Sequence, residues 1–126
     1  MSGANGRELW PSRLYVYQAT VRRIIDADTM ECNIDMGFRM SLAATIRLSR
    51  IDAWETRGPE RPKGEAATEF VRERVWPGDR VTIQTFKSGS FGRWLAELWY
   101  TDDESGVEVN LNDELVENGH ACQWTR

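Results

Sequence analysis

The sequence has few residues of the kinds that build zinc sites or cross membranes. Its 126 residues include two cysteines, Cys32 and Cys122, and one histidine, His120. The cysteines form no CxxC pair, so zinc chemistry is not expected. No segment approaches the roughly 18 consecutive apolar residues of a membrane span, and the N-terminus has no apolar stretch of the signal-peptide kind. We therefore expect a cytoplasmic protein with reduced thiols and no membrane partner.

The chain also lacks an excess of positive charge. Its net charge is -4, which argues against a protein that holds nucleic acid by general basicity. Basic residues are nevertheless clustered between positions 22 and 93, whereas acidic residues gather on the predicted helices and at positions 102–104. A basic face on an acidic body remains compatible with this composition.

The length and composition are those of one soluble globular domain. Residues 1–12, "MSGANGRELWPS", are polar and rich in turn formers, so we expect a flexible arm with Trp10 as an anchor. Residues 13–126 form the predicted domain. Its oligomeric state does not follow from the sequence, and a monomer is the default expectation.

Alternating and β-branched patterns predict five strands, at about residues 14–25, 30–35, 43–51, 80–86 and 93–100. The stretch from Pro62 to Val75 changes to helical spacing and ends at Pro77-Gly78. A second, short helix follows Asn110, which is a suitable cap, and ends at Asn118-Gly119. This order predicts a mainly β, α+β fold: a five-stranded OB-type barrel with one helix between strands three and four and a short C-terminal helix.

The stretch "RLSRIDAWET" gathers charges where the third strand ends. Asp52 is five residues from Arg47 and would lie on the opposite face of an unbroken strand, so the chain must bend before Asp52. If the strand ends at the barrel rim, Arg47, Asp52 and Glu55 converge. Asp28, in the turn after the first strand, then joins them.

These residue types suit phosphodiester hydrolysis. Two carboxylates from separate turns, with backbone carbonyls, form a hard-oxygen site for Ca²⁺ or Mg²⁺. The guanidinium groups of Arg47 and Arg93 can each donate two parallel hydrogen bonds to phosphate oxygens, and Glu55 can accept a proton from water. Taken singly, each has an ordinary explanation: Asp28 as a turn former, Arg47 as a cross-strand partner, and the others as loop residues.

Four motifs, "IIDADT", "IRLSRIDAWET", "FGRWLAELW" and "VNLNDELVENGHA", resemble in order and spacing the signatures of the staphylococcal-nuclease-like (thermonuclease) family. The resemblance covers roughly residues 15–122. It implies an OB barrel and a Ca²⁺-dependent nuclease that hydrolyses DNA or RNA with little sequence preference and leaves 3′-phosphate ends. The main alternative is a catalytically silent OB module that binds single-stranded nucleic acid or protein.

The resemblance also implies roles for individual residues. Asp28 and Asp52 match calcium carboxylates, and Ala53 matches a ligand that binds calcium through its backbone carbonyl. Arg47 and Arg93 match the two catalytic arginines, and Glu55 matches the carboxylate that activates or orients water. Asp26 matches an acidic position that holds metal-bound water.

Substrate contacts are expected from the loop before Arg93 and from Trp54. Relatives carry a Lys-Tyr pair where this chain has Ser90-Phe91, so an ammonium and a phenol are missing there. Phe91 and Lys87 are the candidates in that loop. Trp54 either stacks on a base or packs as a lid on the barrel. His120, just after a helix-ending glycine, is expected to be structural.

Overall fold

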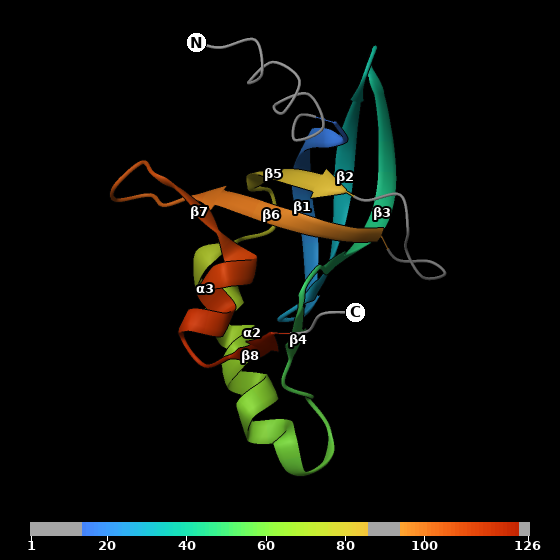
Figure 1. Cartoon of the computed structure of the whole chain (residues 1–126). Helices are drawn as coiled ribbons and strands as arrows, with labels where there is room; N and C mark the ends of the chain where they lie inside the picture. Colours follow the sequence, from blue (N-terminus) through green and yellow to red (C-terminus); the bar gives the residue numbers. More distant parts are fainter. Residues whose placement is uncertain (1–13, 86–93, 124–126) are drawn as a thin grey trace, which may run out of the picture.

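The chain forms a β-barrel with helices packed below it in the view of Figure 1. The computed structural model describes residues 14–85 and 94–123. Within that part, the elements in chain order are β1 (Val16–Asp26), β2 (Thr29–Gly37), β3 (Met40–Leu48), β4 (Ile51–Ala53), the 3-10 helix η1 (Gly58–Glu60), α2 (Arg61–Arg74), β5 (Arg80–Thr85), β6 (Trp94–Thr101), β7 (Glu108–Asn110), α3 (Leu111–Glu117) and β8 (Ala121–Gln123). No helix among these residues is both long and apolar enough to cross a membrane.

Five long strands close the barrel. They are hydrogen-bonded in the order β3-β2-β1-β5-β6, and a parallel pairing between β3 and β6 joins the two ends of the sheet. In that pairing, Ile46 lies beside Trp94 and Leu48 beside Ala96. The five-stranded barrel, the helix between its third and fourth strands and the C-terminal helix confirm the fold predicted from the sequence.

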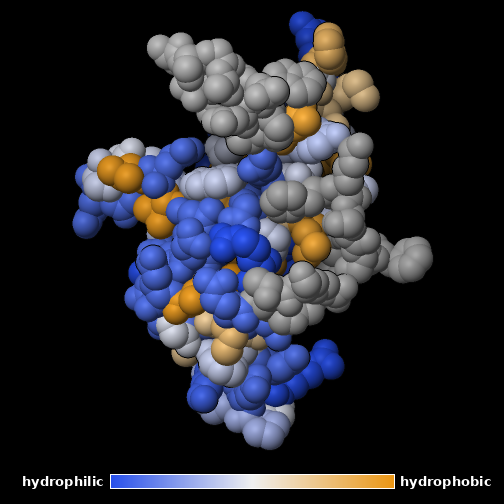
Figure 2. Space-filling model, in the orientation of Figure 1, coloured by the Kyte–Doolittle hydropathy of each residue, from blue (hydrophilic) through white to orange (hydrophobic). Residues whose placement is uncertain are grey.

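The alternation of each strand places its apolar side chains inside the barrel. On β2, Met30, Cys32 and Ile34 are buried, whereas Asn33 and Asp35 are exposed. Burial of each large apolar side chain contributes about 1.5–3 kcal/mol to folding. Burial also raises the pKa of the Cys32 thiol to about 12, so this cysteine is an inert core residue. Figure 2 shows that the outer surface in this view is largely hydrophilic.

An ion pair joins the C-terminal end of α2 to α3. Pro62 lies in the first turn of α2, where its missing N–H costs nothing. The guanidinium of Arg74 lies 3.5 Å from the Phe70 ring centre, and its Nε donates to Glu114 of α3 at 3.2 Å. Asn110 caps α3, because its side chain accepts from the N–H of Asp113, as the sequence predicted.

The third strand differs from the predicted range 43–51. β3 ends at Leu48, and a separate strand, β4, starts at Ile51 and pairs with β8. Between them, Arg50 has a positive φ of 68°, an unusual conformation for a residue with a side chain. This turn is the bend that the positions of Arg47 and Asp52 required, so the bend is confirmed and the single long strand is wrong.

Candidate active site at the lip of the barrel

Asp28 occupies the tight turn between β1 and β2 and ties this turn to β3 and to β4. It is 8% exposed. Its backbone carbonyl accepts from the N–H of Leu48 at 2.8 Å, at the end of β3. Its Oδ2 atom accepts from the N–H of Ala53 in β4 at 3.2 Å. The carboxylate is thus held at the junction where β3 gives way to β4.

Arg47 brings the two predicted metal carboxylates together. It pairs with Thr29 across the β2–β3 ladder, which places it next to the turn containing Asp28. Its Nη2 atom lies 3.5 Å from Oδ2 of Asp28 and 3.2 Å from Oδ1 of Asp52. The Arg47 side chain is only 15% exposed, whereas that of Asp52 is 61% exposed. One side of the site therefore faces solvent, and the other is set into the barrel.

The carboxylates of Asp28 and Asp52 lie close enough together to bind one metal ion, because both contact the same nitrogen of Arg47. Both Asp28 and Asp52 already direct an oxygen to the same positive group, so their oxygens can share a cation. Carboxylate and carbonyl oxygens are the ligands that Ca²⁺ prefers. Within residues 14–85 and 94–123, no three His, Cys, Asp or Glu side chains gather to form a metal cage. The donors fit a hard cation that completes its coordination with water or substrate oxygens.

Glu55 lies two residues beyond β4, in an exposed loop that α2 supports from behind. Its backbone N–H donates to Oε1 of Glu60 at 3.1 Å. Gly64 of α2 packs against the same backbone: a methyl group added there would lie 2.0 Å from the Glu55 carbonyl oxygen. No hydrogen bond joins the Glu55 carboxylate to Asp28, Asp52 or Arg47 in the described part of the chain. The structure thus brings Arg47, Asp28 and Asp52 into contact. Glu55, three residues after Asp52, is exposed to solvent and makes none of these contacts.

Asp26 is connected to this loop from β1. Its Oδ1 atom accepts from the hydroxyl of Thr56 at 3.4 Å. Together with the Gly64 contact, this bond links the residue after Glu55 to both the barrel and α2. The resemblance implied a role for Asp26 near the metal, but the sequence gave no signal for Thr56 or Gly64, since a single threonine and a glycine carry no recognisable catalytic chemistry.

Trp54 packs at the edge of the site. Its indole N–H donates to the Gly119 carbonyl at 2.8 Å, and the Lys63 ammonium lies 4.8 Å from the centre of its ring. The ring is half-buried and joins the acidic loop to the end of α3 and to α2. His120 lies in the same region, with its ring centre 4.5 Å from that of Phe70, a packing contact that fits the structural role expected for it.

Three predicted site residues, Arg93, Lys87 and Phe91, lie outside the described residues. Their roles stay predictions. The strand that follows them, β6, starts at Trp94 beside Ile46 of β3, the residue before Arg47.

A charged cluster centred on the buried Glu97 was missed from the sequence. Glu97 of β6 accepts from the hydroxyl of Ser49 at 2.5 Å and from Nε and Nη2 of Arg50, each at 2.7 Å. Asn110 and Asn112 also donate to it. Burial acts to raise the pKa of Glu97, but the hydrogen bonds from Arg50, Ser49 and Asn110 outweigh it and hold the pKa below its usual value.

This cluster fixes the turn that shapes the site. Arg50, whose backbone makes the bend between β3 and β4, is held by Glu97 and also by Asp113 at 2.9 Å. The bonds to Glu97 raise the pKa of Arg50. The sequence separation of 47 residues between Arg50 and Glu97 gave no local pattern from which the pair could be predicted.

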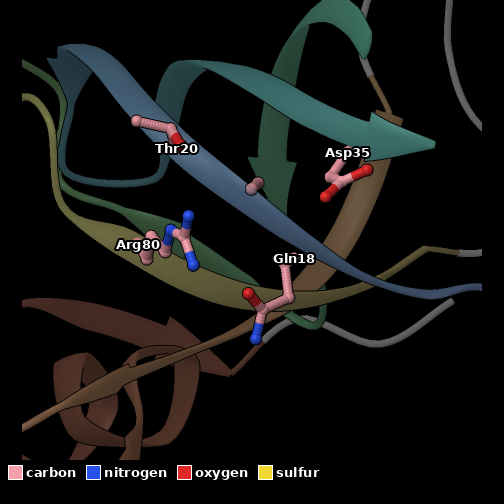
Figure 3. Close-up of a pocket in the computed structure, with 5 residues that line it drawn as sticks. Gln18, Thr20, Asp35 and Arg80 are labelled. Carbon is pink, nitrogen blue, oxygen red and sulfur yellow. The ribbon is translucent and has the colours of Figure 1, made fainter. Parts of the chain in front are cut away.

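A small polar hollow lies away from this lip, on the outer surface of β1, β2 and β5 (Figure 3). It is lined by Gln18, Ala19, Thr20, Asp35 and Arg80. The Asp35 carboxylate already accepts from the N–H of Gly37 at 2.8 Å. The hollow contains none of the predicted site residues and is not a second part of the site.

The fold and the lip together define an OB-type barrel with a charged site at one rim. A family model described as staphylococcal nuclease homologue matches residues 45–126. The chain belongs to this family, as its motifs predicted. The matched range includes Arg47, Asp52 and Glu55, whereas Asp26 and Asp28 precede it. The comparison with curated proteins found no match.

Proposed function

We propose that this protein is a Ca²⁺-dependent nuclease that hydrolyses phosphodiester bonds of DNA or RNA with little sequence preference. The observation that carries the proposal is the contact of Asp28 and Asp52 with a single nitrogen of Arg47 at the barrel lip. At a solvent-facing rim, carboxylates can bind a metal cation while a neighbouring guanidinium binds the phosphate of a nucleic acid. Membership of a nuclease family supports the same reading.

The proposed reaction divides the work among a few side chains. Arg47, and Arg93 as predicted from its motif, bind the phosphate oxygens and balance the charge that grows on them. Glu55 accepts a proton from a water molecule as the water oxygen attacks phosphorus. The bond between phosphorus and the 5′ oxygen breaks, the 5′ oxygen takes up a proton from solvent, and Glu55 returns its proton to solvent, which leaves a 3′-phosphate on one product and a 5′-hydroxyl on the other.

Asp28, Asp52 and the carbonyl of Ala53 are the groups that would hold Ca²⁺. When bound, the ion supplies positive charge beside the phosphate and so favours the transition state. Asp28 holds its carboxylate in place through the bond from Ala53, so one ligand position is organised before any ion binds. Lys87, Phe91 and Trp54 are proposed to contact the nucleic acid outside the reacting phosphate. The cellular site of action is proposed to be the cytoplasm.

The decisive experiment compares Glu55→Gln with Glu65→Gln. Glu65 is also exposed, and its carboxylate pairs only with Arg61 in the described structure. Purified variants are incubated with single- and double-stranded DNA and RNA, with Ca²⁺ or a chelator, and the product ends are analysed. Loss of a proton acceptor lowers turnover by about 10²–10⁴-fold, so Glu55→Gln should be nearly inactive and Glu65→Gln close to wild type.

The result would separate the nuclease from a silent binding module. A wild-type protein that binds these substrates without cutting them, with or without Ca²⁺, would contradict the proposal and favour the module. Cutting that survives in Glu55→Gln would instead keep the nuclease and remove Glu55 from the proton-accepting role.

A further inference from the structure

The hairpin of β2 and β3 extends past the barrel and exposes large apolar side chains at its end. The pairing of β1 with β2 starts at Ala19 and Ile34, so β3 is the one described strand that pairs with β2 beyond Ile34 (Figure 1). In Figure 2 the end of this hairpin, at the top, is coloured as hydrophobic beside a hydrophilic tip. The exposed apolar residues of the hairpin are Met36, Phe38, Met40 and Leu42.

These side chains continue the inner face of the barrel. Alternation along β3 places Met40 and Leu42 on the same side as the buried Ile46, and Leu42 pairs with Ile34 across the ladder. Ile34 is 4% exposed and Leu42 is 44% exposed. The apolar face is therefore covered at the barrel and uncovered on the hairpin.

Among the described strands, none pairs with the outer edge of β3 over this stretch. Its pairing with β6 begins only at Ile46. The N–H of Leu48 points toward β2, since it donates to Asp28, and that of Ser49 points toward β6, since it donates to Ala96. Because successive backbone groups point to opposite edges, those of Ser41 and Ala43 face outward. Within the described residues, no strand pairs with this part of the edge.

The sequence of this edge does nothing to prevent pairing. Residues 40–45 read "MSLAAT" and contain no charge, glycine or proline. Proteins usually protect exposed edges with such residues, because a free edge recruits another strand. An uncharged edge beside an uncovered apolar face indicates a surface that is covered by a partner.

We propose that the partner is a second copy of this chain, paired antiparallel through β3 about a two-fold axis at Leu42. In this register Ser41 of each copy exchanges backbone hydrogen bonds with Ala43 of the other. The two Leu42 side chains lie opposite each other, and each Met40 lies opposite the smaller Ala44. A two-fold axis perpendicular to the sheet keeps both apolar faces on one side, so they join into one continuous surface.

Charge permits this self-association despite the net charge of -4. Asp35 is paired with Ser41, so it is one strand back from the interface. It would be three strand spacings, about 14 Å, from β2 of the second copy. That separation exceeds the screening length of about 8 Å at physiological salt, so acidic side chains oppose the pairing only weakly.

The proposed interface lies at the opposite end of the β2–β3 ladder from Arg47 of the candidate active site. Arg47 lies opposite Thr29 at one end of the β2–β3 ladder, whereas Met40 lies opposite Gly37 at the other. Dimer formation and nuclease activity are therefore independent proposals, and either can fail without the other.

Sedimentation over a range of concentrations tests the pairing, with Leu42→Lys and Met36→Lys as a matched pair. Met36 is 39% exposed, close to the value for Leu42, but it lies on β2, away from the free edge. The wild type and Met36→Lys should dimerise. Leu42→Lys should weaken the dimer about tenfold or more, since it replaces a buried apolar pair by opposed like charges.

Cross-linking keeps the test valid if Leu42→Lys disturbs folding. Cys122 is exposed and is first replaced by serine, while Cys32 is buried and stays. In that background Leu42→Cys should oxidise to a covalent dimer, because residues opposite each other on the axis lie within disulfide distance, and Met36→Cys should not. A wild type that is monomeric at all concentrations, or a dimer that neither Leu42 variant affects, would overturn the proposal and leave the face to a different partner.

Discussion

The contact between Gly64 and the loop that carries Glu55 gives a sharp test of the proposed site. Gly64 lies in the first part of α2, and the backbone of residues 55 and 56 passes directly over it. An alanine at this position would place its methyl carbon 2.0 Å from the Glu55 carbonyl oxygen and 2.7 Å from the Thr56 nitrogen. The obstacle is backbone and not a flexible side chain, so the loop must move.

The size of the movement follows from these distances. An ordinary carbon–oxygen contact is about 3.5 Å, so the loop must retreat by more than 1 Å. Displacement of a reacting group by about 1 Å costs on the order of 10²-fold in rate. The effect on stability is smaller: crowding costs about 1–3 kcal/mol, and alanine returns about 0.5–1 kcal/mol in a helix. Gly64→Ala should therefore fold and lose most of its turnover.

Turnover on DNA in the presence of Ca²⁺ measures the first effect, and urea unfolding measures the second. Glu65→Ala, at the exposed neighbouring position of the same helix, serves as the control for a change in helix propensity. Calcium affinity should be unchanged in Gly64→Ala, since the described bonds of the Asp28 and Asp52 carboxylates run to Arg47, Ala53 and Thr29 and not to the loop over Gly64. A Gly64→Ala variant with wild-type turnover would show that the position of Glu55 does not matter for the reaction.

Three further predictions concern the charged groups. Arg47→Lys should lower turnover at least tenfold because one ammonium cannot replace a planar fork, whereas Arg72→Lys on the exposed face of α2 should not; equal rates would reject the fork. Asp52→Asn should weaken Ca²⁺ binding in calorimetry and Asp103→Asn should leave it unchanged, and the reverse order would place the ion elsewhere. Glu97→Gln should cost about 1–3 kcal/mol in urea unfolding at pH 7. The pKa of Glu97 is lowered on folding, so the stability that the ionised carboxylate contributes is complete above the unfolded value of 4.5 and is lost as pH falls through the folded value. Glu97→Gln should therefore also be less sensitive to acid than the wild type. An unchanged acid transition in this variant would contradict that linkage.

The parts of the site that could be predicted were those set by local geometry. The alternation of β2 and β3 and the spacing from Arg47 to Asp52 required a bend, and Arg50 provides it with its positive φ. The turn containing Asp28 had to lie at the same rim because β2 and β3 pair from Thr29 and Arg47 onward. Hairpin pairing links residues that are near in sequence, so a pattern along the chain was sufficient.

What could not be predicted depends on contacts between distant segments. Glu97 comes to Arg50 because the barrel closes with a parallel pairing of β3 and β6, and no local pattern specifies which acidic residue faces the bend. Gly64 reads as an ordinary residue of an amphipathic helix, since its importance is the absence of a side chain where another backbone passes. The exposed end of the β2–β3 hairpin could not be predicted either. Alternation identifies the inner face of a strand, but it does not show where the neighbouring strand stops.

The position of Asp28 makes stability and metal binding inseparable at this residue. Its carbonyl fixes the end of β3 and its carboxylate fixes the end of β4, so removing the side chain leaves the N–H of Ala53 without its acceptor at a partly buried place. Loss of activity on such a change would be open to two explanations. Glu55 and Gly64 are better probes, because the Glu55 carboxylate carries none of these strand contacts and the methyl group at Gly64 displaces only the loop. The roles of the proton acceptor and of its support can therefore be measured without disturbing the junction that holds the cation ligands.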